Sequence, residues 1–289
     1  MALQLTPHIS YFDKSFKESQ TRNYTLSIKL WLNGLVFTIY NPEKNKFVGI
    51  EQYEFPEVET IEQLPSYLGK ILNHRPSFAF PYRQVFLLYH NKFSTLVPEP
   101  LFSEDKKNLY LGFNQTFQEN SRIVFDELKN NQSVNVYYLP NPVIEKVKDF
   151  WPNANILHHS TVLIESLSIN FKNKADTKTL FVNLCDTSFD LVYFKENKLH
   201  YYNSFDFKTK EDFIYFLLIS IDQLMLNPED VNLLILGNIN KTDDTYSMIN
   251  QYIKNYSFIP RNDNYGYSYI LDELKYYTYY TLFNALQCE

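Results

Sequence analysis

The sequence predicts an α/β protein built from two similar halves. Apolar runs with the length of strands alternate with segments in which apolar residues recur at helical spacing. Each half shows the same order of elements: three strands, a helix, a strand and a helix. A three-strand meander followed by a crossover helix implies a mixed sheet with helices on both faces.

The first half begins with a strong strand pattern, because apolar residues dominate 25–55 and turn residues interrupt them at Asn33-Gly34 and at 41–46. The region from Pro98 to Asn120 is interpreted as irregular, and at 124–128 a strand cannot be distinguished from a helix. The remaining expectations are strands at 25–32, 35–40, 47–55, 84–89, 134–139 and 155–158, and helices at 61–73, 142–150 and 160–167.

The polar segment 170–177 interrupts the pattern, and the order of elements starts again after it. We therefore expect a first lobe over residues 1–173 and a second over residues 174–289. Expected strands of the second lobe are 180–184, 189–194, 199–205 and 231–236, and expected helices are 209–226, 245–255 and 272–286.

A direct comparison of the halves indicates a duplication. The segment Thr25-Leu-Ser-Ile-Lys-Leu aligns with Thr179-Leu-Phe-Val-Asn-Leu, and residues 35–40 align with 189–194 without a gap between the segments. Few residues are identical, so the shared pattern of apolar positions carries the comparison.

Composition excludes several classes of protein. The 24 Phe, 24 Tyr and 2 Trp among 289 residues supply ample apolar surface, which excludes a mainly disordered chain. The net charge is −6 without a basic block, so we expect no nucleic-acid partner. Two cysteines, Cys185 and Cys288, form neither a disulfide framework nor a four-cysteine zinc site. We expect no metal and no cofactor.

The sequence also predicts a cytoplasmic protein without membrane insertion. Its longest apolar run, 213–221, has nine residues and is too short to cross a bilayer. Residues 1–13 lack the basic start and the apolar stretch of a secretory signal.

One segment of the second half resembles a known motif. Val182-Asn-Leu-Cys-Asp-Thr-Ser-Phe-Asp-Leu191 is similar to the phosphate-binding hairpin of actin, the sugar kinases and the heat-shock chaperone ATPases. In these families an Asp stands at the position of Asn183, and glycines stand at 185–187. Residues 233–238, which end in Gly237-Asn238, resemble the adenosine-binding motif, and 155–165 resembles a strand that leads into the helix between the lobes. The resemblance implies two actin-like, ribonuclease H-like lobes with a cleft between them.

Departures from the family pattern predict that ATP turnover has been lost. Glycine lets backbone N–H groups approach phosphates closely, whereas residues 185–187 carry three β-carbons and the Asp186 carboxylate. In the first half, Lys29 aligns with the expected Asp, and Trp31 aligns with a glycine. The expected remnant of a nucleotide site consists of Asn183, Asp186, Thr187, Ser188, Asp190, Gly237 and Asn238.

Three functions stay open at this point. We expect a catalytically inactive, pseudo-ATPase-like protein that works by binding another protein, and the sequence leaves its oligomeric state open. The second hypothesis is an active ATP-dependent phosphotransferase or ATPase with an atypical site made of Asp186, Ser188, Asp190 and Gly237. The third is a small-molecule sensor that uses the interlobe cleft.

Each candidate residue also has a purely structural interpretation. Asn183 and Ser188 can bond nearby backbone, Asp190 can point outward from its strand, and Gly237 can form a tight turn after a strand. We expect Cys185 to be a small buried strand residue. His158 and His159 are neighbours that cannot face one metal from a strand, so we expect structural roles for both.

Overall fold

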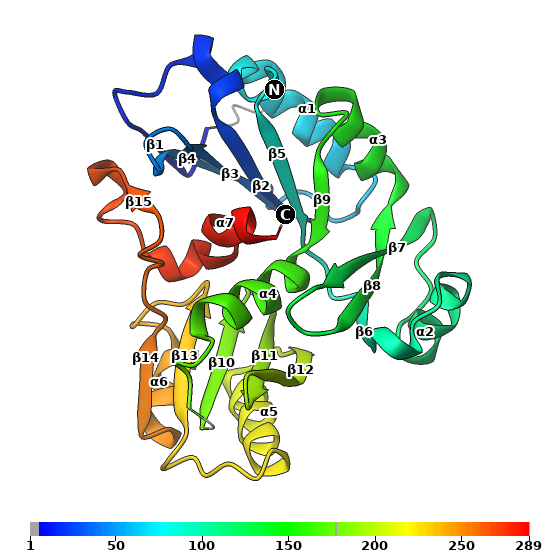
Figure 1. Cartoon of the computed structure of the whole chain (residues 1–289), viewed down its shortest axis with the longest axis vertical. Coiled ribbons are helices and arrows are strands. Elements are labelled where there is room, and N and C mark those ends of the chain that lie inside the picture. The colour runs from blue at the N-terminus through cyan, green and yellow to red at the C-terminus, as the bar shows by residue number, and fades with distance from the viewer. Residues whose placement is uncertain (1–5, 177, 289) are drawn as a thin grey trace. The chain divides into compact units, whose positions relative to one another are not determined.

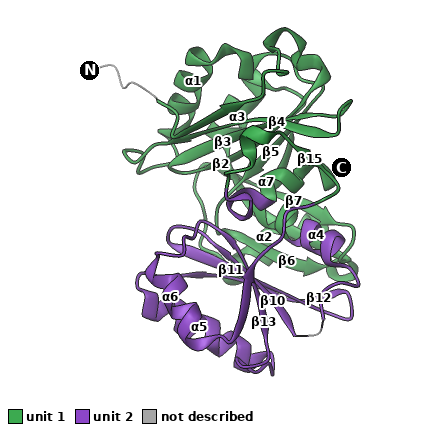
Figure 2. Ribbon diagram, turned by 90° about the vertical axis from the view of Figure 1, so that its left-hand side faces the viewer, with its two compact units in different colours: residues 1–163, 263–274, 281–289 green, residues 164–262, 275–280 purple. Residues whose placement is uncertain are grey.

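The computed structural model describes residues 6–176 and 178–288 (Figure 1). The chain forms two compact units, one of residues 1–163, 263–274 and 281–289 and the other of residues 164–262 and 275–280 (Figure 2). The sequence-based boundary at 173 follows helix α4 (His159–Phe171), whose residues from 164 onward belong to the second unit.

A seven-stranded mixed sheet forms the centre of the first unit. Its order is β1-β4-β3-β2-β5-β9, and β15 pairs with β4. Strands β2, β3 and β4 form the expected antiparallel meander, while β5 runs parallel to β2 and β9 runs parallel to β5. The strands are β1 (Ile9–Phe12), β2 (Thr25–Trp31), β3 (Gly34–Asn41), β4 (Lys46–Glu54), β5 (Gln84–Tyr89), β9 (Asn155–His158) and β15 (Gly266–Tyr267).

Helices cover both faces of this sheet. The buried residues of α1 (Leu64–His74) and α3 (Asn141–Phe150) pack with Leu26, Ile28 and Leu30 of β2 in one core. On the other face Phe86 and Leu88 pack with Val162 of α4 and Ala285. Because side chains alternate across a strand, neighbouring residues of β5 serve the two cores.

A three-stranded antiparallel sheet with one helix lies between β5 and α3 in the chain. Its order is β6-β8-β7, and Leu111 of α2 packs with Val134 and Val136 of β8. The interpretation of residues 98–120 as irregular was wrong for α2, because large apolar side chains stand on the outer face of this helix and hide its amphipathic period. These elements are β6 (Ser94–Pro98), α2 (Lys107–Asn114), β7 (Ser121–Leu128) and β8 (Ser133–Pro140).

A five-stranded mixed sheet forms the centre of the second unit. Its order is β12-β11-β10-β13-β14, with an antiparallel meander and with β13 and β14 parallel to β10. Its elements are β10 (Thr179–Leu184), β11 (Ser188–Lys195), β12 (Lys198–Asp206), α5 (Lys210–Gln223), β13 (Asn232–Gly237), α6 (Asp244–Tyr252) and β14 (Asn255–Phe258).

The two sheets repeat one plan, which confirms the predicted similarity of the two halves. When β1 and β15 are left aside, the third strand of the meander lies at one edge of each sheet. Two parallel strands follow the first meander strand on its other side. Register irregularities fall between Ile39 and Tyr40 in β3 and between Tyr193 and Phe194 in β11, which are equivalent positions in the alignment of 35–40 with 189–194. Such irregularities tend to be kept within a protein family. Their occurrence at equivalent positions therefore supports a common origin of the two sheets.

The expected helix at 272–286 was wrong. Only α7 (Tyr280–Asn284) is α-helical there, and 3-10 turns flank it at Tyr276–Tyr279 and Ala285–Gln287. Tyrosines dominate this segment, and their rings pack individually, as Tyr277 does on Phe258 within the second unit. Further 3-10 turns span Glu18–Asn23, Pro76–Ala79, Glu99–Leu101, Glu104–Lys106 and Tyr269–Leu271.

Candidate functional site

The β10–β11 hairpin is the segment that resembles a phosphate-binding loop. Asp186 and Thr187 form its two-residue turn, which Cys185 closes by donating its N–H to the Ser188 carbonyl at 2.8 Å. Cys185 lies after the end of β10, is half-buried and forms no disulfide, so the expectation of a buried strand residue was wrong. Asp186 and Thr187 are exposed.

Below the turn, the hairpin holds a buried polar pair. Asn183 lies opposite Asp190 in the ladder, and its Nδ2 donates to Asp190 Oδ2 at 2.8 Å. The Tyr202 hydroxyl donates to the other oxygen of Asp190 at 3.2 Å. Asp190 is 2% exposed, which corrects the expectation that it points outward. A buried carboxylate with these donors is a structural group of the sheet.

Two of the expected site residues meet across neighbouring strands. Asn238 Nδ2 donates to Asp186 Oδ1 at 2.6 Å. Gly237 has a φ of +94°, and a Cβ there would lie 2.0 Å from the Leu184 carbonyl oxygen. The close approach of two backbones therefore requires the glycine at 237. The packing of the described residues is therefore sufficient to explain the glycine at 237, without a bound ligand.

The ends of these strands border a depression of about 550 Å³. Four carboxylates and two lysines line it, namely Asp186, Glu211, Asp243, Asp244, Lys208 and Lys210. Its net charge is therefore negative, and Lys210 is paired with Asp244 at 3.4 Å. The four carboxylates would repel a bound anion, and only the two lysines would offset that repulsion.

Carboxylates of the chain also occupy the backbone donors that could hold a phosphate. Asp212 Oδ2 accepts from the N–H groups of Lys208 and Thr209 at 3.1 Å each, and Thr209 completes a capping box with Asp212. In the β13–α6 loop, Asp243 Oδ2 accepts from the Asn240 N–H at 2.6 Å. At the start of α5 and in the loop before α6, side-chain carboxylates therefore accept the backbone hydrogen bonds that a bound phosphate would accept.

The equivalent hairpin of the first unit has different side chains on the same register. Lys29 lies opposite Val36, as Asn183 lies opposite Asp190. The Trp31 ring occupies the space beside Gly34, where a Cβ would meet ring carbon Cζ2 at 2.3 Å. A cation and an indole therefore stand where a magnesium–triphosphate complex needs carboxylate and open backbone.

A buried polar network in the first unit was missed by sequence reasoning. Asp126 of β7 accepts from the His158 N–H at 2.8 Å, the Thr161 hydroxyl at 2.7 Å and the Tyr137 hydroxyl at 3.0 Å. Ser160 bridges His158 Nδ1 and Asn135 Nδ2 at 2.7 and 2.9 Å. No local signal links these positions, because the network joins residues up to 35 apart in the chain.

Burial controls protonation in this network. Desolvation raises the pKa of Asp126 to about 6 and lowers the pKa of His158 to about 3. Burial and then the charge of Lys29 lower the pKa of His90, and burial, His90, His158 and Lys29 lower that of His159. The three histidines are therefore neutral at pH 7, and the hydrogen bonds of His158 fit the structural role expected for it.

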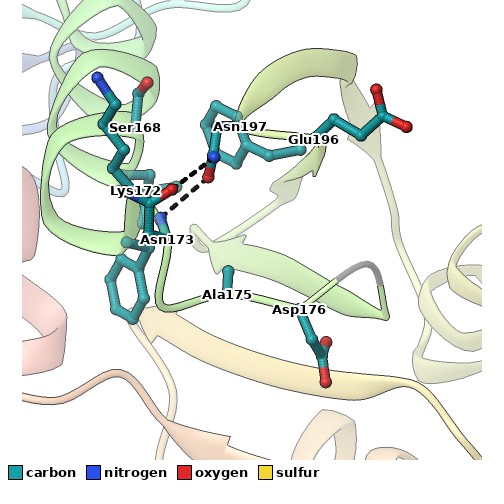
Figure 3. Close-up of a pocket in the computed structure, with 10 residues that line it drawn as sticks. Ser168, Lys172, Asn173, Ala175, Asp176, Glu196 and Asn197 are labelled. Carbon is teal, nitrogen blue, oxygen red and sulfur yellow. Dashed lines mark hydrogen bonds between the residues drawn. The ribbon is translucent and has the colours of Figure 1, made fainter.

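A second depression of about 370 Å³ lies in the second unit between the end of α4 and the β11–β12 turn (Figure 3). Its apolar side chains are Leu167, Phe171, Ala175 and Phe194. Asn173 and Asn197 join its walls by two hydrogen bonds, of 2.9 Å from the Asn173 N–H and 2.7 Å from Asn197 Nδ2. Both asparagines have left-handed backbones, which asparagine tolerates. Glu196 points away from this pair.

Two further properties bear on the class of protein. Among residues 6–176 and 178–288, no helix is long and apolar enough to span a membrane. Within the same residues, no three His, Cys, Asp or Glu side chains converge in a way that could hold a metal ion.

Comparisons with solved structures define the class. A Bacteroides thetaiotaomicron protein with an actin-like ATPase fold and unknown function matches with a TM-score of 0.76 and 24% identity, over 86% of this chain and 96% of that one. The PilM–PilN type IV pilus biogenesis complex matches with a TM-score of 0.59 and 13% identity, over 93% of this chain and 99% of that one. The protein therefore has an actin-like fold with two lobes, as the resemblance of its hairpin predicted.

The family follows from the sequence. The model of a family of proteins of unknown function, DUF3822, matches residues 13–256. The chain belongs to this family. No curated protein matches its sequence at a significant level.

Proposed function

We propose that the protein is a catalytically inactive actin-like protein, a pseudo-ATPase, that acts by binding another protein. The observation that carries the proposal is the hydrogen bond from Asn238 to Asp186. It places a carboxylate at the turn where the families with a phosphate-binding hairpin have glycines. Bringing a triphosphate to this turn would break that bond and oppose like charges.

The neighbouring donors support the same conclusion. The N–H groups of Lys208, Thr209 and Asn240 already donate to the carboxylates of Asp212 and Asp243. A phosphate would have to displace these local anions, which are held at high effective concentration by the chain itself. At the position equivalent to Asn183, Lys29 supplies no ligand for a magnesium ion.

Protein binding is the role that an actin-like scaffold without turnover can still perform. PilM, whose fold is similar, is named as one member of a complex with PilN. We propose the same type of role, the binding of another protein, for the present chain, but not PilN as its partner. The proposal includes a cytoplasmic location, which fits the observation that neither Cys185 nor Cys288 forms a disulfide.

Thermal melting of the full chain with a panel of nucleotides, with and without Mg²⁺, and with sugars tests the absence of a nucleotide site. A ligand present at 100 times its Kd stabilises a protein by about 2.7 kcal/mol, which is a shift of several degrees. We expect no nucleotide-dependent shift and no release of phosphate. A shift with ATP–Mg²⁺ that disappears in Asp186→Ala, together with phosphate release, would support the atypical ATPase instead.

A second experiment tests the binding role. Affinity purification from native cells supplies candidate partners, and calorimetry with the purified components then measures binding. The proposal requires a candidate that binds with defined stoichiometry and whose binding is unchanged by nucleotides. Stabilisation of the chain by a metabolite, without product, would favour the sensor hypothesis.

A further inference from the structure

The two meanders differ at their outer edges. In the first unit, β1 pairs antiparallel with residues 49–52 of β4, and β15 pairs with the start of the same strand. The equivalent strand of the second unit is β12, which stands at the border of its sheet (Figure 1). Among residues 6–176 and 178–288, no strand pairs with the outer edge of β12. An open strand edge is a template on which another chain can add a strand.

The strands β4 and β12 are equivalent residue by residue. Each has nine residues, and their pairing with β3 and β11 matches residues 46–54 to residues 198–206 without a gap. The register irregularity of each hairpin lies at the same point of this match. The segment that covers the edge of β4 therefore indicates what fits the edge of β12.

The backbone of β12 turns outward at Ser204. Phe207 donates its N–H to the Thr187 carbonyl at 3.0 Å, and the alternation along an antiparallel strand then directs the backbone groups of Ser204 away from β11. The Ser204 N–H accordingly donates to the Asn203 side chain, at 3.0 Å. The equivalent residue of β4, Gln52, accepts a backbone N–H at 2.8 Å from the residue before β1. An added strand can bond to the backbone of Ser204 in the same way.

Charge indicates what kind of segment fits this edge. Asp13, directly after β1, donates its N–H to the Val48 carbonyl at 2.8 Å and accepts from Lys46 Nζ at 3.2 Å. Lys198 stands at the position of Lys46 in β12, is exposed, and has no ion-pair partner among the described residues. The edge of β12 thus presents a cation at the point where the first unit supplies a carboxylate.

We infer that the outer edge of β12 binds an extended segment of another protein, which adds as an antiparallel strand and places a carboxylate on Lys198. The inference rests on the proposed function, because it names the surface through which the chain binds its partner. By analogy with β1, the added strand pairs with residues 201–204, and its carboxylate follows directly after the strand. Main-chain hydrogen bonds supply the affinity in this mode of recognition, and the carboxylate fixes the register.

The first unit supplies the probe, a synthetic peptide of residues 6–15 with Phe12→Ala. Phe12 lies over Gly49, where a Cβ would approach its ring at 2.7 Å, whereas Tyr201 stands at that position in β12. Alanine leaves room for the tyrosine ring. Fluorescence anisotropy of the labelled peptide with the full chain, from about 10 μM to about 1 mM protein, should show saturable binding. Absence of binding at about 1 mM overturns the inference.

Two variants of the chain locate the bound peptide. Ser204→Pro removes an outward N–H and no ladder bond, so binding should weaken at least tenfold while the melting temperature stays close to that of the wild type. Lys198→Glu should weaken binding about threefold or more, and a peptide that also carries Asp13→Lys should restore it. Lys254→Glu is the matched control, because Lys254 is exposed and precedes β14 at the opposite edge, and this variant should bind like the wild type.

The outcomes separate this inference from the proposed function. Binding that neither Ser204→Pro nor Lys198→Glu weakens, or that Lys254→Glu weakens equally, overturns the inference. If Ser204→Pro melts well below the wild type, the exchange of charge between Lys198 and the peptide decides alone.

A purified partner that binds Ser204→Pro as tightly as the wild type overturns the inference and leaves the proposed function standing. Sedimentation velocity of the wild type supplies the last outcome. A dimer that Ser204→Pro dissociates would assign the edge of β12 to a second copy of the chain, and it would also overturn the inference.

Discussion

The β2–β3 hairpin of the first unit and the β10–β11 hairpin of the second place equivalent residues in the same register. In the first, Lys29 and Val36 stand opposite each other, and in the second Asn183 and Asp190 form a buried hydrogen bond. The comparison teaches that the two hairpins share one backbone arrangement while their side chains make different contacts. The turn of the second hairpin consists of Asp186 and Thr187, and in the first hairpin the Trp31 ring lies beside Gly34.

The units also differ in how they hold titratable groups. Five of the six histidines, at 8, 74, 90, 158 and 159, lie in the first unit. Three of these have lowered pKa values, chiefly because they are buried. The second unit contains His200 alone. Acid therefore acts on the units unequally, and four experiments examine this and related differences in order of expected effect.

Acidification should destabilise the first unit most. His158 has a folded pKa of about 3, below its usual 6.5, so its contribution is present above pH 6.5 and is lost as the pH falls toward 3. The loss from this residue is on the order of 4–5 kcal/mol. Asp126, with a pKa raised to about 6, works in the opposite direction between pH 6 and 4, because the native state binds its proton more tightly.

Hydrogen exchange between pH 7 and pH 4 measures this effect unit by unit. With three histidines against one carboxyl, we expect amides of the first unit to lose protection before those of the second. Equal loss in both units, or earlier loss in the second, would contradict the account.

Gly237→Ala should destabilise the second unit by about 3 kcal/mol or more. The added methyl group would meet the Leu184 carbonyl at 2.0 Å, and the φ of +94° disfavours alanine. The equivalent pair in the first unit is Leu30 with Tyr89, so the same strand ends tolerate a large side chain there. Denaturant unfolding measures the change.

The matched control for this substitution is Gly69→Ala in helix α1. A Cβ at 69 approaches only the flexible end of Lys146, at 3.2 Å. This variant should be stabilised by up to ~1 kcal/mol, because alanine favours a helix. A similar loss of stability in the two variants would show that the close approach of Leu184 does not require glycine at position 237.

Asn183→Leu should cost about 2–3 kcal/mol, because Asp190 stays buried and loses a donor. Replacing both partners in Asn183→Leu/Asp190→Leu should recover most of that loss. Urea unfolding of the single and double variants forms a double-mutant cycle. An additive cycle would mean that the pair does not act as a unit.

Lys29→Met is the smallest expected change, within about 1 kcal/mol at pH 7 for a half-buried residue. Because Lys29 contributes to the low pKa of His90 and His159, its removal should raise both pKa values. NMR titration of the histidine rings follows this shift. Unchanged ring titrations would place Lys29 too far away to matter.

The order of elements and the duplication could be predicted because they depend on local periodicity. Apolar residues of α1 recur at 64, 68, 71 and 72, and the meander strands show continuous apolar runs bounded by turn residues. The gapless alignment of the two hairpins also anticipated their common register. Helix α2 escaped this reasoning because its exposed Leu109 and Phe113 obscure the polar face that marks a surface helix.

The interior of the site could be predicted only in part. The sequence shows that no glycine stands at 185–187 and that Asp186 places a carboxylate there. The direction of Asp190 depends on which face of the sheet is covered, and its partners Asn183 and Tyr202 come from two other strands. The network around Asp126 likewise joins separate strands, and single-sequence patterns carry no information about such distant contacts.

Calorimetric titration of the full chain with ATP–Mg²⁺ tests the central claim most directly, because the claim is that the chain's own side chains occupy the phosphate positions of its second hairpin. We predict no heat of binding up to millimolar nucleotide, both for the wild type and for a buffer-matched Asn238→Ala variant that loses its bond to Asp186. Saturable binding with a micromolar Kd in the wild type would contradict the claim.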